Sequence, residues 1–154
     1  MTVEPPDLVT LDSVLRIAWI VLAVAVGGWG LSAGSAETMM SVSMGCAKIG
    51  EIGAAYRCDD RAVDVLGWWN LLGVVALLVV PCLAPAVVAA RRVAWSAVAI
   101  LVALAVFGLT RVTETSYLDS LMVGFPVALV GAGLATLQGR REKKAARSAQ
   151  WPGG

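Results

Sequence analysis

Four long apolar stretches fill most of this 154-residue chain and constrain its fold more than any other feature. The last three contain no charged residue, and the first contains only Arg16, near its start. An α-helix needs about 20 apolar residues to cross the hydrocarbon core of a bilayer, so each stretch predicts a transmembrane helix. The four predicted spans are residues 14–34, 65–90, 93–110 and 120–139.

Composition indicates the same class of protein. Hydrophobic residues make up 58% of the chain and charged residues 15%, and the mean hydropathy is +0.79. About a quarter of the residues in an ordinary soluble domain are charged. The sequence therefore predicts an all-α integral membrane protein with a single domain, a four-helix transmembrane bundle whose helices run up, down, up and down.

The basic residues predict how this bundle is oriented. If all four stretches cross the membrane, most of the Lys and Arg residues lie on one side: Arg16, Arg91, Arg92, Arg140, Arg141, Lys143, Lys144 and Arg147. Short flanks rich in Lys and Arg stay in the cytoplasm. We therefore expect a multi-pass protein of the plasma (cell) membrane with both termini cytoplasmic. The lead-in would then be 1–13, the basic tail 140–154, and the external loops 35–64 and 111–119.

Aromatic residues agree with this orientation, because Trp and Tyr gather where lipid headgroups meet hydrocarbon. Trp19 and Trp95 lie near the predicted inner ends of the first and third spans. Near the predicted outer ends lie Trp29, Trp68, Trp69 and Tyr117. The sequence thus predicts one aromatic girdle at each membrane surface.

The first stretch has an alternative interpretation as a signal peptide. The small residues from Ser32 to Ala36 offer a cleavage site, and cleavage would leave three spans. The region before the apolar run from Ile17 to Leu31 is acidic and has a single Arg, and the run itself is long for a signal peptide, so both features favour a retained helix. Pro5 and Pro6 predict a disordered lead-in up to Leu11.

The external loop between the first two spans contains Cys46 and Cys58. On the oxidising side of a membrane such a pair predicts a structural disulfide, which would stabilise the loop by about 3 kcal/mol. Cys82, within the second span, is expected to behave as a small apolar residue.

Two local patterns flank the first loop cysteine. Apolar residues alternate with small ones from Met40 to Cys46, which is the period of a half-buried strand, and predict a short strand or hairpin over the bundle. Ile49, Ile52 and Tyr56 have the spacing of one face of a short helix.

Candidate hinge or packing residues lie within the spans. Pro81 and Pro85 remove backbone donors from the second span and predict a bend there. Pro126 and Gly131 in the fourth span predict a similar bend and close approach of a neighbouring helix, together with the small residues Gly124, Gly133 and Ala135. The few polar residues of the spans, Asn70, Ser96 and Thr136, are expected to bond to neighbouring helices.

The tail residues Arg140, Arg141, Lys143 and Lys144 directly follow the last span. Contact with anionic lipid headgroups, worth about 1 kcal/mol per basic residue, is the expected role of these side chains. A run this short does not predict nucleic-acid binding. The chain has no histidine, and neither a cofactor nor a metal is expected.

Four spans with two external cysteines resemble the claudin-like proteins and the quinone-linked membrane thiol oxidoreductases. The element Trp29-Gly30-Leu31 lacks the second tryptophan of the first family, and the Cys-x-x-Cys pair of the second is absent. Neither family is therefore assigned.

The function predicted from these features is that of a non-catalytic accessory or structural subunit of a larger membrane protein assembly. Its partners would be the lipid bilayer and other membrane protein subunits, with a homo-oligomer as a further possibility. The first alternative is a small oligomeric transporter or channel that uses the proline-containing second span. The second alternative is a membrane thiol-redox protein.

Overall fold

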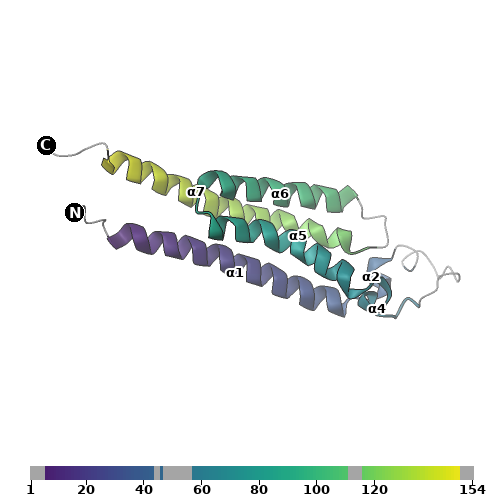
Figure 1. The fold of residues 1–154 in the computed structure, drawn as a ribbon. Coiled ribbons are helices and arrows are strands. Elements are labelled where there is room, and N and C mark those ends of the chain that lie inside the picture. The colour runs from purple at the N-terminus through teal and green to yellow at the C-terminus, as the bar shows by residue number, and fades with distance from the viewer. Residues whose placement is uncertain (1–5, 44–45, 47–56, 111–115, 150–154) are drawn as a thin grey trace.

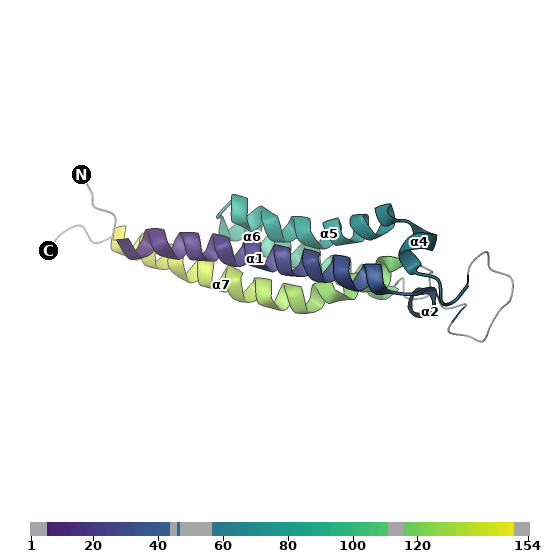
Figure 2. The same ribbon diagram turned by 90° about the horizontal axis from the view of Figure 1, so that it is seen from below.

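The structure, a computed structural model, describes residues 6–43, 46, 57–110 and 116–149. Four long helices lie side by side (Figure 1; Figure 2). Each contains a segment long and apolar enough to cross a membrane, as the sequence predicted. The four helices are α1 (Pro6–Ala36), α5 (Trp68–Val87), α6 (Arg91–Thr110) and α7 (Gly124–Ala149).

The helices have unequal lengths, and this gives the bundle two different ends. Helix α1 has 31 residues and α7 has 26, against 20 each for α5 and α6. At 1.5 Å per residue, α1 is about 46 Å long and α5 about 30 Å. The start of α1 and the end of α7 lie at one end, where both helices extend past the turn between α5 and α6 (Figure 1). We call this the terminal end and the opposite one the loop end.

The structure differs from the sequence-based expectation at the start of the chain and adds a detail at the start of the fourth span. Helix α1 already begins at Pro6, within the segment expected to be disordered. A proline is favourable at the first helical position, because its missing N–H has no partner there in any helix. In the fourth span, the residues Tyr117–Val123 form a 3₁₀-helix, η1, and the α-helix starts only at Gly124.

Glycines of α1 bring it close to α5. A Cβ atom added to Gly27, Gly30 or Gly34 would meet the side chains of Val79, Val75 and Leu71, respectively, at contact distance or closer. Residue numbers rise along α1 while those of their partners fall along α5, so the two helices are antiparallel. Small residues at such an interface allow close helix packing.

Helices α6 and α7 pair in the same way. A Cβ on Gly124 would lie 2.7 Å from the carbonyl oxygen of Leu101. A Cβ on Gly131 would lie 3.3 Å from Cγ2 of Val98. At the loop end, Gly108 of α6 faces η1, where a Cβ would lie 2.6 Å from the carbonyl oxygen of Leu118. The bundle is therefore built from two antiparallel pairs, α1 with α5 and α6 with α7.

Two aromatic residues assigned to the predicted girdles are buried inside the bundle. Trp19 has an exposed fraction of 0% and packs against Gly131 of α7, where a Cβ would lie 3.0 Å from its ring. Tyr117 is also buried. Both belong to the apolar core that joins the helices. Exposed tryptophans are Trp29, Trp68, Trp69 and Trp95.

The outward faces of the four helices are apolar. Val24 of α1, Val80 of α5, Val106 of α6 and Leu129 of α7 are all exposed large hydrophobic residues. A soluble protein rarely presents continuous apolar surface of this kind. The exposed faces therefore require an apolar environment or a partner.

Candidate functional site

The loop end is closed by a small cap that follows α1. It comprises α2 (Met39–Val42) and α4 (Ala62–Leu66) with the chain segments beside them (Figure 1). Thr38 and Arg61 form an isolated antiparallel bridge. Around it, the amide of Met39 donates to the carbonyl of Asp60 over 2.9 Å, and the amide of Ala62 donates to that of Glu37 over 2.9 Å. These bonds hold the two chain segments of the cap together.

The predicted strand at residues 40–46 is wrong, because residues 39–42 form helix α2. Met39 and Val42, three residues apart, are both buried, and Met40 between them is exposed. The segment therefore buries apolar side chains with a helical spacing. The helix predicted around residues 49–56 lies outside the residues that the structure describes.

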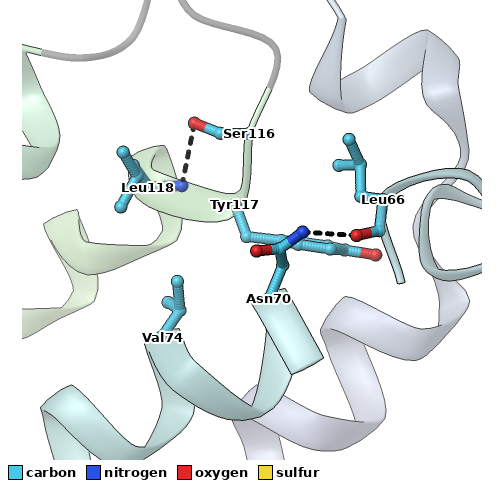
Figure 3. A pocket seen from close by; sticks show the side chains of 6 residues that line it. All are labelled: Leu66, Asn70, Val74, Ser116, Tyr117 and Leu118. Atoms are coloured by element: carbon cyan, nitrogen blue, oxygen red, sulfur yellow. Dashed lines mark hydrogen bonds between the residues drawn. The ribbon is translucent and has the colours of Figure 1, made fainter. Parts of the chain in front are cut away.

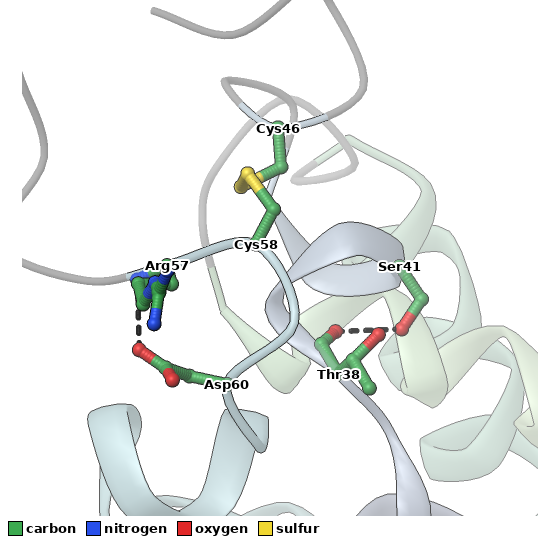
Figure 4. The surroundings of a disulfide bond; sticks show 6 residues. All are labelled: Thr38, Ser41, Cys46, Arg57, Cys58 and Asp60. Atoms are coloured by element: carbon green, nitrogen blue, oxygen red, sulfur yellow. Dashed lines mark hydrogen bonds between the residues drawn. A yellow bond between two sulfur atoms is a disulfide. The ribbon is translucent and has the colours of Figure 1, made fainter. Parts of the chain in front are cut away.

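The predicted disulfide is confirmed. The sulfur atoms of Cys46 and Cys58 are bonded, and their Cα atoms lie 5.6 Å apart (Figure 4). Beside the bond, the amide of Arg57 donates to a carboxylate oxygen of Asp60 over 2.7 Å, and the amide of Met40 donates to the carbonyl of Cys58 over 2.9 Å. The disulfide thus joins the cap at the point where its backbone is already hydrogen-bonded. Cys82 is a buried free cysteine within α5.

Tyr117 ties η1 to the end of α1. Its hydroxyl donates to the carbonyl oxygen of Gly34 over 3.3 Å. Gly34 lies in the last turn of α1, where carbonyl groups have no partner within the helix. Burial, and then the negative charges of Glu37 and Asp64, raise the pKa of the Tyr117 phenol above its ordinary value of 10.0. The buried phenol therefore stays protonated and acts as a donor at neutral pH.

A cavity of about 210 Å³ lies beside this tyrosine (Figure 3). Three of its lining residues have polar side chains, and each of these already has a partner, Gly34 in the case of Tyr117. The Asn70 amide donates to the carbonyl of Leu66, and the Ser116 hydroxyl accepts from the amide of Leu118 over 3.4 Å. The full lining is Leu66, Asn70, Val74, Ser116, Tyr117 and Leu118. The cavity is suited to a small, largely apolar group and lies at the loop end of the bundle.

The polar residues of the spans do not bond to neighbouring helices as expected. The Ser96 hydroxyl donates to the carbonyl of Val93 over 2.8 Å, and that of Thr136 donates to Gly133 over 2.7 Å. Asn70 likewise bonds to the chain four residues before it. All three residues are exposed. Their hydrogen bonds are local, because a carbonyl one turn earlier is always within reach of a short polar side chain.

The predicted hinge residues lie in two different settings. Pro81 and Pro85 are buried inside α5, which continues to Val87. Near them, the thiol of Cys82 donates to the carbonyl of Leu78 over 3.4 Å. Pro126 is exposed and lies in the first turn of α7, where an amide has no partner within the helix. Pro126 thus stands at the start of an α-helix, where proline is tolerated, whereas each proline of α5 removes a hydrogen bond inside a helix.

The terminal end has a second hollow, of about 620 Å³, lined by Ala90, Arg91, Arg92 and Trp95. The side chain of Arg91 runs along α7, where a Cβ on Gly139 would lie 2.9 Å from its Nε atom. Arg140, the next residue of α7, is exposed. The other predicted headgroup ligands, Arg141, Lys143 and Lys144, continue α7, but their side chains lie outside the described part of the chain.

Sequence reasoning missed three of these features. The glycines of α1 have the spacing of a small-residue packing face, a signal that was present in the sequence. No local pattern pointed to the bond from Tyr117 to Gly34 or to the contact of Arg91 with Gly139, because both join residues distant in the chain. Comparison of the chain with protein-family models, with curated proteins and with solved structures found no match.

Proposed function

We propose that the protein is an integral protein of the plasma (cell) membrane whose four helices cross the bilayer up, down, up and down. The length and apolar character of the four helices support this arrangement, as do their exposed apolar faces and the two antiparallel pairs. The even number of crossings places both termini on one side.

That side is the cytoplasm in this proposal. Arg91, Arg92 and the basic end of α7 belong to the terminal end of the bundle, and such basic flanks remain cytoplasmic. The disulfide between Cys46 and Cys58 belongs to the loop end. Disulfides persist on the oxidising side of a membrane, so both features support an external cap.

Impermeant thiol labelling on intact cells tests the orientation. A cysteine introduced at the exposed position Ala36, near the cap, should be labelled, and one introduced at Ser148 should be labelled only after the cells are opened. The parent for both variants carries Cys82→Ala, so that the introduced cysteine is the reactive thiol. Labelling of Ser148→Cys on intact cells would contradict the orientation, and absence of residues 1–34 from the mature protein would identify a cleaved signal peptide.

The function that the geometry supports best is that of a non-catalytic accessory or structural subunit. The observation that carries this proposal is the apolar core shared by all four long helices, on which an ordered, disulfide-linked cap is built. The polar side chains of Asn70, Ser96 and Thr136 are exposed rather than gathered in the core. Such a bundle is suited to hold a shape that other membrane protein subunits recognise.

The loop end offers the recognition surface. Trp69, at the start of α5, is 86% exposed. Exposed aromatic residues are enriched among those that dominate the binding energy of protein interfaces. The partner in this proposal is a second membrane protein subunit with an apolar external face, and a second copy of this chain is the alternative partner.

Purification from native membranes in mild detergent tests this role. The protein should elute with a second membrane protein in a fixed ratio, and Trp69→Ala should abolish this co-elution. Val87→Ala, at an exposed position at the other end of α5, is the matched control and should leave the complex intact. Elution of the wild-type protein as a monomer would contradict the proposal, and a defined oligomer of this chain alone would favour the alternative.

A small oligomeric transporter or channel is the second candidate. It is favoured by one observation, the placement of Pro81 and Pro85 inside a helix that runs between the two hollows of the bundle. Solute flux into liposomes containing the purified protein would support this candidate if Pro81→Ala and Pro85→Ala changed the rate. The thiol-redox alternative requires that the Cys46–Cys58 bond exchange electrons with quinone, and rapid reduction by a quinol would support it.

A further inference from the structure

The hollow at the start of α6 is the feature of the terminal end that the proposed function does not use. Two guanidinium groups and an indole, from Arg91, Arg92 and Trp95, line it together with Ala90. Arg91 and Trp95 are four residues apart in α6 and therefore lie on the same face of that helix. The hollow thus combines positive charge with an aromatic surface.

Basic residues of two helices, α6 and α7, lie in this region. The Arg91 side chain lies against Gly139 of α7, with its Cδ, Nε and Cζ atoms all within 3.3 Å of the position that a Cβ would occupy. A larger residue at this position would push the flexible Arg91 side chain aside. Arg140 follows directly and is exposed. The glycine therefore seats one guanidinium beside the basic end of α7.

The chemistry of these groups matches a phosphate ester. A guanidinium donates two parallel hydrogen bonds to phosphate oxygens. The hollow lies at the N-terminal end of α6, where the helix dipole adds to the attraction for an anion. Trp95 is 41% exposed. An indole in that position suits the boundary between headgroups and acyl chains, because it has an apolar body and a polar N–H.

We propose that this hollow binds the headgroup phosphate of one anionic phospholipid, with Arg91 and Arg92 as its ligands and Trp95 against the start of the acyl chains. The proposal rests on the membrane insertion proposed above. It differs from attraction of the basic tail to a charged surface, because the tail attracts any anionic headgroup whereas the hollow retains a single lipid by its geometry.

Lipid retention measured by native mass spectrometry tests this site. The full-length protein in detergent is mixed with phosphatidylglycerol or with phosphatidylcholine, and the wild-type protein should retain one phosphatidylglycerol in preference. Arg91→Gln with Arg92→Gln should weaken this retention about thirtyfold, since each basic residue near a lipid surface contributes about a fivefold change in affinity. Arg57→Gln with Arg61→Gln removes the same charge from the loop end and should leave retention unchanged. Equal loss in both double variants would overturn the proposal.

A second variant tests geometry without changing charge. Gly139→Val should displace the Arg91 side chain and lower phosphatidylglycerol retention, although every basic residue is still present. Gly133→Val is its matched control, because nothing lies within 4 Å of a Cβ at that position. If both glycine variants retained phosphatidylglycerol equally well, net charge alone would explain the retention. The proposal of a site with a defined geometry would then be overturned.

Two further outcomes identify the ligand and separate this proposal from the previous one. Exclusion of phosphatidylglycerol by an equal concentration of inorganic phosphate would assign the hollow to a soluble anion and reject the lipid. Resistance of the expressed protein to extraction by alkaline carbonate reports insertion independently of lipid retention. An inserted protein without lipid preference rejects this site alone, whereas an extractable protein rejects the proposed membrane fold.

Discussion

The two ends of the bundle are held in different ways. At the loop end, a disulfide, backbone hydrogen bonds between two chain segments and the Tyr117 hydroxyl join parts of the chain to one another. At the terminal end, α1 and α7 extend past the turn between α5 and α6, and two arginines line an open hollow. The groups that define the loop end find partners within the protein, while the proposed partner at the terminal end is a lipid.

In the proposed membrane orientation, with the cap outside and the basic end at the cytoplasmic surface, this difference gives the two ends different roles. A cap outside the membrane is surrounded by water and has too few residues for a core of its own, so covalent and backbone links must order it. A basic end at the cytoplasmic surface lies beside anionic headgroups that can complete its interactions. Substitutions at the loop end should therefore change stability, and those at the terminal end should change the response to lipid.

Removal of the disulfide should have the largest effect on stability. Cys46→Ser with Cys58→Ser should lower the free energy of unfolding by about 3 kcal/mol, because the open loop gains conformational freedom when unfolded. Thermal unfolding in detergent, with and without a reducing agent, measures this change. Cys82→Ala is the control that keeps the bridge and should remain sensitive to the reducing agent. A double variant as stable as the oxidised wild type would show that the cap does not depend on the bond.

Filling a close contact at the loop end should have the next largest effect. Gly108→Ala places a Cβ 2.6 Å from a backbone oxygen of η1, and overpacking of this kind costs about 1–3 kcal/mol. Gly133→Ala, where a Cβ meets nothing, should instead stabilise α7 by up to about 1 kcal/mol through its helix propensity. Denaturation midpoints of the two variants should therefore shift in opposite directions. Equal shifts would contradict the close packing of α6 on η1.

Tyr117→Phe should have a smaller effect with a characteristic pH dependence. Loss of the bond to Gly34 should lower stability by about 1 kcal/mol at neutral pH. Because the folded-state pKa of this phenol is raised above 10.0, the unfolded state loses its proton first as the pH rises. The contribution of Tyr117 is thus complete below pH 10.0 and declines above it.

Unfolding temperatures measured between pH 8 and pH 11 test this dependence. The difference between wild type and Tyr117→Phe should narrow at the alkaline end, since ionisation then opposes folding of the wild type alone. A constant difference across the range would show that the phenol is not desolvated as the structure indicates.

The smallest expected effect belongs to the terminal end. Added phosphatidylglycerol should raise the unfolding temperature of the wild-type protein, because a ligand that binds only the folded state stabilises it by mass action. Arg91→Gln with Arg92→Gln should remove this increase. Without lipid, the free energy of unfolding of the double variant should stay within about 0.5 kcal/mol of the wild-type value. If the double variant were much less stable than the wild type without lipid, the two arginines would stabilise the protein through internal contacts, as the groups of the loop end do.

The long helices could be predicted from the sequence, and the cap could not. Apolar length alone identifies a potential span, whereas helix α2 depends on tertiary burial of Met39 and Val42. Over so short a segment, alternating and helical patterns cannot be told apart by period alone. The disulfide between Cys46 and Cys58 could be predicted, because both cysteines were assigned to the oxidising side of the membrane. The chain has only one other cysteine that could compete for either of them. The 3₁₀-helix η1 carried no comparable signal.

The aromatic residues show where an average preference fails. Trp19 was predicted at the membrane surface, but Gly131 of α7 leaves room for its ring within the core. Tyr117 was predicted there too, yet its hydroxyl has a carbonyl partner at the end of α1. Both outcomes depend on a contact between distant helices. The same is true of Arg91, whose position next to Gly139 was not visible in either local sequence.

The pairing of α1 with α5 and of α6 with α7 has a consequence for biosynthesis. Each pair joins two long helices that follow one another in the chain. The first hairpin can form while the third span is still in the ribosome, and the second can assemble on it afterwards. If the chain crosses the membrane as proposed, insertion and helix association can therefore proceed together, two helices at a time.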